Sequence, residues 1–190
     1  MKTKKQKKEK DVHAGKVVKG VKELKPLFKK AKELSDSIDL SSLKELKKQS
    51  TVIKEVAYKG IKISKKADID ELVLLILQTQ AYKDRVLEYL LSYVRMQSKI
   101  SSLKKQAVAI LWKTNGAYLK GFKTECTRNI MIDDLIWPIS KPLNDLDSLL
   151  AVCKEININL TSTSFALKEV GALAQRVLDL VKQSRASHGG

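Results

Sequence analysis

Apolar residues recur at alternating steps of three and four along two long stretches of the chain. The first stretch comprises Tyr82, Val86, Tyr89, Tyr93, Met96, Ile100, Leu103, Ala107 and Ile110. The second comprises Leu146, Leu149, Cys153, Ile156, Leu160, Thr163, Leu167, Val170, Ala174, Val177 and Val181. Such spacing puts the apolar side chains on one face of a helix, where a second helix can cover them. We therefore predict an all-α fold, a helical bundle built on a long antiparallel coiled-coil-like hairpin.

Two shorter helices are expected before the hairpin. The first has apolar residues at helical spacing up to Ile38 and is interrupted or restarted at Pro26. The sequence SDSIDLSS over residues 35–42 predicts a connection. Ser42 and Glu45 then have the spacing of a capping box at the start of the second helix. These two helices either complete a four-helix bundle or form a separate arm.

Three other stretches interrupt the helical pattern. Residues 59–66 alternate between apolar and basic, which is compatible with a short extended segment. Residues 114–121 hold an Asn-Gly pair and a second glycine, which indicate the end of a helix or a break in it. Residues 131–142 contain Pro138 and Pro142, and we predict a connector there, held in place by burial of residues 135–137.

The chain is thus expected to divide into four parts. A disordered basic tail covers residues 1–12, and basic N-terminal helices cover residues 13–66. The long hairpin or bundle core covers residues 67–184, and a frayed end covers residues 185–190.

Positive charge is concentrated in two parts of the chain. The 190 residues include 37 lysines and arginines against 21 acids, a net charge of +16. Residues 1–66 hold 21 lysines, no arginine and 8 acids, whereas residues 95–128 hold 8 basic residues and a single acid, Glu125. Positive charge this large and this concentrated attracts nucleic acid, anionic lipid or an acidic protein.

We predict that the basic helices bind nucleic acid by neutralising phosphates. The candidate residues are Lys16, Lys19, Lys22, Lys44, Lys47, Lys48, Lys54, Arg95, Lys99, Lys105, Lys113, Lys120 and Lys123. Lysine favours contacts to the nucleic-acid backbone over bidentate readout of bases. Trp112 and Tyr118 lie close to some of these lysines, and either stack on bases or pack in the core.

The opening sequence MKTKKQKKEK has three interpretations. It is an arm that binds nucleic acid, a signal read by a nuclear import receptor, or a solvated end. We expect an intracellular protein, cytoplasmic or nuclear if eukaryotic, because no apolar stretch follows the basic start. The longest apolar run, Leu72–Leu77, is also too short to cross a bilayer.

Enzymatic chemistry has little support in the sequence. The two histidines lie near the termini, and the adjacent carboxylates Asp133 and Asp134 would point apart on a helix. We expect no catalytic residue, metal site or cofactor, and we expect Cys153 to be a small core residue.

Two other functions fit the same patterns. In one, the protein is an assembly or adaptor subunit whose heptad seams pair with a second copy of the chain or with another helical protein. In the other, basic amphipathic helices within residues 1–66 attach the protein to an anionic membrane surface. Segregation of charge favours nucleic acid over both.

Overall fold

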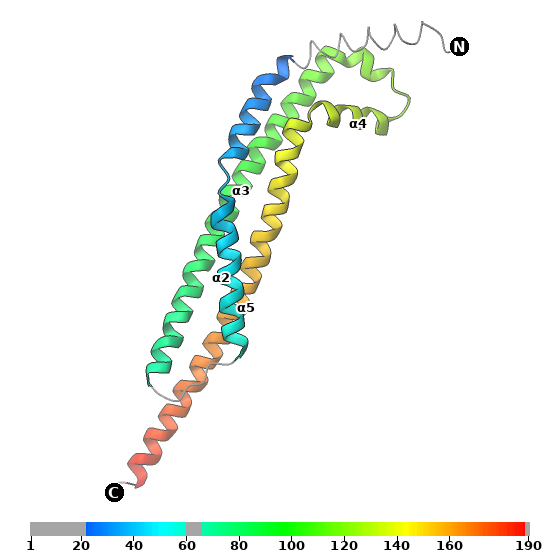
Figure 1. Ribbon diagram of the computed structural model, residues 1–190. Helices are drawn as coiled ribbons and strands as arrows, with labels where there is room; N and C mark the ends of the chain where they lie inside the picture. The colour runs from blue at the N-terminus through cyan, green and yellow to red at the C-terminus, as the bar shows by residue number, and fades with distance from the viewer. Residues whose placement is uncertain (1–21, 60–65, 189–190) are drawn as a thin grey trace, which may run out of the picture. The chain divides into compact units, whose positions relative to one another are not determined.

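A computed structural model describes residues 22–59 and 66–188, and their regular structure is entirely helical (Figure 1). One helix covers residues 22–36, and four follow it: α2 (Leu40–Lys59), α3 (Lys66–Lys120), α4 (Glu125–Leu135) and α5 (Trp137–His188). The long helices α3 and α5 pack together, so the prediction of an all-α helical bundle is confirmed. The predicted tail over residues 1–12 and most of the predicted extended segment lie outside the described residues.

The chain forms two compact units, each assembled from separate segments. Unit 1 comprises residues 1–38 and 93–149, and unit 2 comprises residues 39–92 and 150–190. The helix over residues 22–36, the second half of α3, α4 and the start of α5 therefore belong to unit 1. Unit 2 contains α2, the first half of α3 and most of α5.

Each unit buries part of the apolar seams that the spacing predicts, and the seam residues Tyr82, Tyr89, Met96, Ile110, Leu149 and Val170 are half-buried. In unit 1 the largest fully buried side chains are Leu24, Tyr93, Ile100, Leu111, Leu119, Ile136, Ile139 and Leu146. In unit 2 they are Leu72, Ile156, Leu160 and Leu167. Cys153 is fully buried as predicted, and its burial raises the pKa of the thiol to about 11.

The predicted α5 seam is buried only as far as Ala174. Val177 and Val181 are 58% and 42% exposed. A Cβ added at Gly171 would lie 3.6 Å from Leu72 Cδ2, so α3 and α5 are in close contact there. Since α3 begins only six residues before Leu72, the part of α5 that follows Gly171 soon has no α3 beside it. The last turns of α5 therefore extend past the start of α3 (Figure 1).

The interruption over residues 114–121 is confirmed, and it is both a kink and an end. Asn115 has non-helical angles, φ −126° and ψ 17°, inside α3, and the helix ends at Lys120. By contrast, Pro26 lies within the helical residues 22–36 and does not interrupt them.

The prediction of a connector over residues 131–142 is wrong. Those residues form the end of α4 and the start of α5, with a break at Ile136. Pro138 lies in the first turn of α5, where backbone N–H groups have no helical acceptor, and Pro142 removes only one bond a turn later. Trp137, predicted to be buried, is 54% exposed.

The start of α2 is also capped differently from the prediction. Asp39 Oδ1 accepts hydrogen bonds from the backbone N–H groups of Ser41 and Ser42, both at 3.1 Å. The Ser42 hydroxyl, expected to cap the helix with Glu45, donates to Asp39 Oδ2 instead. Hydrogen bonds from Ser42 and Ser41 lower the pKa of Asp39 to about 2.

Candidate nucleic-acid interface

Most of the net positive charge belongs to unit 1. Its residues include 22 lysines and arginines against 10 acids, a net charge of +12, of which residues 1–21, outside the described part of the chain, contribute +6. Unit 2 has 15 basic residues against 11 acids, a net charge of +4. Attraction of a polyanion is therefore strongest at unit 1.

The predicted lysines and arginine are divided between the two units. The exposed members in unit 1 are Lys22, Arg95, Lys99, Lys105, Lys113, Lys120 and Lys123. The members in unit 2 are Lys44, Lys47, Lys48 and Lys54, all on α2. Lys16 and Lys19 lie outside the described residues. The α2 lysines thus belong to a different unit from the others.

Two of the α2 lysines contact polar side chains of α5. Lys47 Nζ lies 3.6 Å from Glu155 Oε2, and Lys54 Nζ donates to Asn159 Oδ1 at 3.2 Å. Lys54 is half-buried, and Glu155 partly neutralises Lys47. These two side chains therefore contribute more to packing within unit 2 than to a surface that attracts phosphate.

Before the kink at Asn115, the unit 1 members on α3 lie mainly along one face. Arg95 and Lys99 are four residues apart, and Lys113 follows Lys99 by 14 residues, close to four full turns. Lys105 follows Lys99 by six residues, so it points about 120° away from that face. In the part of the chain that the structure describes, none of these four side chains forms an ion pair.

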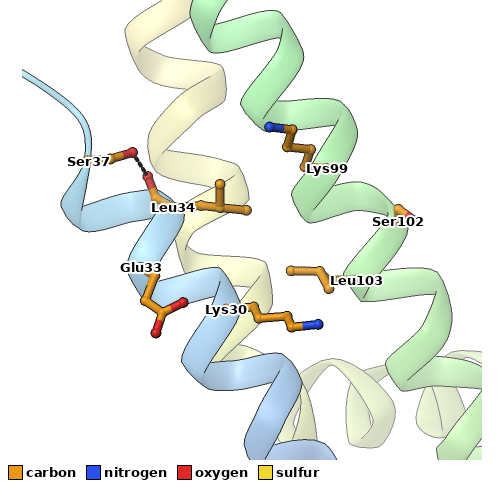
Figure 2. A pocket seen from close by; sticks show the side chains of 7 residues that line it. All are labelled: Lys30, Glu33, Leu34, Ser37, Lys99, Ser102 and Leu103. Atoms are coloured by element: carbon orange, nitrogen blue, oxygen red, sulfur yellow. Dashed lines mark hydrogen bonds between the residues drawn. The ribbon is translucent and has the colours of Figure 1, made fainter.

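A hollow of about 530 Å³ separates the helix over residues 22–36 from α3. It is lined by Lys30, Glu33, Leu34, Ser37, Lys99, Ser102 and Leu103. Figure 2 shows Lys30 and Lys99 reaching toward the gap from opposite helices, with Leu34 and Leu103 between them. The Ser37 hydroxyl donates to the carbonyl of Leu34 at 2.7 Å. The hollow is therefore lined by two ammonium groups and one carboxylate, that of Glu33, together with the apolar side chains of Leu34 and Leu103.

A second hollow, also of about 530 Å³, lies between the same helix and the start of α5. Its lining residues are Phe28, Lys29, Lys32, Ser35, Pro138, Lys141, Pro142 and Asp145. Lys29 also lies 3.8 Å from Glu33, an exposed pair of little energetic weight. The helix over residues 22–36 thus presents lysines toward both of its neighbours in unit 1.

Four lysines at these hollows were not among the candidate residues, although the spacing of Lys16, Lys19 and Lys22 also extends to Lys30. Lys29 and Lys32 continue the helical spacing of Lys25, so the sequence did contain a signal for them. Lys30 lies on the same helix and faces the predicted Lys99 from the other side of the hollow. Lys141 is more than 100 residues away from that helix in sequence, and only the folded structure brings it there.

Neither aromatic candidate is fully available for stacking. The guanidinium carbon of Arg128 lies 5.6 Å from the centroid of the Trp112 ring, in a cation–π contact that covers one face. The rings of Tyr118 and Phe122 meet edge to face at 5.1 Å. These contacts favour a packing role for both aromatic side chains.

Comparison of the chain with protein-family models, curated proteins and solved structures found no match. Within residues 22–59 and 66–188, the structure shows no group of histidine, cysteine and acidic residues able to hold a metal ion. In the same residues, no helix is long and apolar enough to cross a membrane.

Proposed function

We propose that this protein binds nucleic acid without catalysis, through phosphate contacts made mainly by unit 1. The observation that supports this most is the hollow with Lys30 and Lys99 at its rim, next to Arg95 on the same face of α3. Two phosphates of a flexible strand, or of one duplex edge, can approach these three cations at once.

The energetics favour such contacts. Lys99 and Arg95 are exposed and have no acidic partner among the described residues, so a phosphate replaces water rather than a carboxylate. Each neutralised phosphate releases condensed counterions, which makes binding favourable at low salt. Lysine contributes this attraction without reading the base sequence, so we expect little sequence preference.

A salt titration of binding tests the proposal directly. About seven phosphate contacts predict a slope near −6 in a plot of log affinity against log salt concentration. Raising the salt from about 50 to 200 mM should then weaken binding about 10³–10⁴-fold. The probes are single-stranded DNA, duplex DNA, RNA and anionic phospholipid vesicles, each measured by fluorescence anisotropy or co-sedimentation.

Two double variants with the same change of charge locate the site. Lys30→Gln with Lys99→Gln should weaken binding and make the salt slope shallower by about 2. Lys44→Gln with Lys48→Gln removes two exposed α2 lysines of unit 2 and should have the smaller effect. Affinity that hardly changes with salt would rule out the proposal. Equal effects of the two double variants would rule out unit 1 as the main site.

One observation favours a second function, assembly through helix pairing. Among the described residues, 15 of the 18 large apolar side chains that are exposed belong to unit 2. Unit 1, which has most of the charge, exposes only Val94, Ile130 and Trp137. Contiguous exposed apolar surface usually indicates an interaction site. Assembly through unit 2 is compatible with nucleic-acid binding through unit 1.

A further inference from the structure

One outward face of α5 in unit 2 combines exposed apolar residues with charges of both signs. It comprises Phe165, Glu169, Ala172, Leu173, Arg176 and Leu180, all of which are exposed. At 100° per residue these side chains fall within an arc of about 100°. Phe165, Leu173 and Leu180 are 66%, 60% and 64% exposed, although each would favour burial by about 1.5–3 kcal/mol.

The order of residues along this face is complementary to itself in reverse. Two antiparallel copies of α5, related by a twofold axis between residues 172 and 173, place Phe165 of each copy opposite Leu180 of the other. The same register places Glu169 opposite Arg176, and Ala172 opposite Leu173. Apolar residues then meet apolar residues, and each acid meets a base twice by symmetry. The geometry points to a second copy of this chain as the occupant of the face, and we propose that the protein dimerises through antiparallel pairing of α5.

Charge balance also favours a second copy here over other occupants. The stretch over residues 165–182 has three basic residues and two acids, so it neither repels a second copy strongly nor attracts a polyanion. Unit 1, with its net charge of +12, would repel an identical surface. An acidic partner would be repelled by Glu169, and a basic partner would be repelled by Arg176. The antiparallel copy instead pairs both residues with opposite charges.

The length of the face sets the expected strength of the dimer. Residues 165–180 span about 24 Å of helix, a short contact typical of weak or transient association. Beyond them, Val177 and Val181 continue the internal seam of unit 2 past the start of α3 and add apolar surface nearby. We therefore expect association in the micromolar range rather than the nanomolar range.

Sedimentation equilibrium without nucleic acid tests this pairing. Over about 2–200 μM protein, the average mass should rise from 21.3 kDa toward twice that value. Arg176→Glu places like charges opposite each other at two symmetric sites and should weaken association about 10–100-fold. Glu169→Arg should do the same. Lys154→Glu, an exposed change of the same sign that lies 11 residues before Phe165 and beyond the paired stretch, should leave association unchanged.

The charge-swapped double variant gives the decisive comparison. Glu169→Arg combined with Arg176→Glu restores both pairs, so its dimerisation should return to within about threefold of wild type. A wild type that stays monomeric would overturn the proposal, as would unweakened association of Arg176→Glu or failure of the double variant to recover. Binding of the wild type to anionic vesicles that Phe165→Ser abolishes would assign the face to a membrane and overturn it as well.

Because these measurements contain no nucleic acid, their outcome is independent of the phosphate-binding proposal. Monomeric Arg176→Glu should still show the steep salt dependence of nucleic-acid binding, since residues 22–38 and 93–149 of unit 1 are unchanged.

Discussion

Leu160 offers the sharpest test of how the α5 seam is buried. Its side chain is fully buried in unit 2, whereas Ile158, two residues earlier on the same helix, is 67% exposed. Leu160→Asp and Ile158→Asp each replace a branched aliphatic side chain by a carboxylate. The two substitutions therefore differ mainly in where α5 places the side chain.

The expected loss of unfolding free energy follows from the burial of Leu160. Truncating a buried leucine costs about 2–5 kcal/mol, through lost burial and the cavity that remains. A carboxylate at the same site lacks a partner and adds several kcal/mol of desolvation. The total is at least about 5 kcal/mol, close to the whole free energy of unfolding of many domains. We expect Leu160→Asp to lose helicity at 25 °C, and Ile158→Asp to change the free energy of unfolding by less than about 1 kcal/mol.

Far-UV circular dichroism in urea and on heating measures both effects. Because Leu160 is buried within a single chain, its substitution should destabilise the protein even at about 2 μM, where the proposed dimer is mostly dissociated. Two results would refute the reasoning. One is a Leu160→Asp protein that melts like the wild type with the same mass. The other is an Ile158→Asp protein as unstable as Leu160→Asp.

Three further predictions follow from the charge, the α2 cap and the cysteines. Deleting residues 1–12 removes six lysines and two acids, so nucleic-acid binding should weaken but persist with unchanged helicity, and complete loss would make the tail the main site. Asp39 has a folded pKa of about 2, below its ordinary 3.8, so its cap stabilises α2 fully above about pH 4 and is lost as the pH falls through about 2. The difference in melting temperature between wild type and Asp39→Ala should shrink over that range, and a constant difference would contradict the cap. A thiol reagent at pH 8 should modify exposed Cys126 at once and Cys153 only on unfolding, since Cys153 is buried with a pKa of about 11, and fast reaction of both would contradict that burial.

The helical seams could be predicted because heptad spacing depends directly on which residues are buried. Ile100 and Leu160 lie where the spacing put them, and both are fully buried. The same rule failed at Val177 and Val181, because spacing does not show where the partner helix ends. The start of α3 relative to α5 depends on tertiary packing, and no local pattern contains that information.

Local signals failed where several residues could have served the same purpose. Asp39, Ser41 and Ser42 all suit a helix N-cap, and the sequence could not rank three such residues within four positions. The effect of proline depends on its position in a helix, so Pro138 and Pro142 looked like breaks but lie in the first turns of α5.

The candidate site was only partly predictable for a related reason. Lysines spaced along one helix are visible in the sequence, and Lys99 was identified in that way. The hollow that Lys99 shares with Lys30, and the one that contains Lys141, are formed by helices distant in sequence. The sequence does not decide between stacking and packing for Trp112, because its contact with Arg128 also depends on the fold.

The interleaving of the two units has a consequence for how the chain folds during synthesis. When residue 92 has been made, neither unit has all of its helices, because both still need a segment of α5. Unit 1 can fold once residue 149 has left the ribosome. In unit 2, α2 and the first half of α3 must wait for residues 150–190. The contact between Lys47 and Glu155 spans more than 100 residues, so its closure is entropically costly and late. During that interval the apolar faces of α2 and early α3 are exposed, which makes nascent unit 2 the expected client of chaperones.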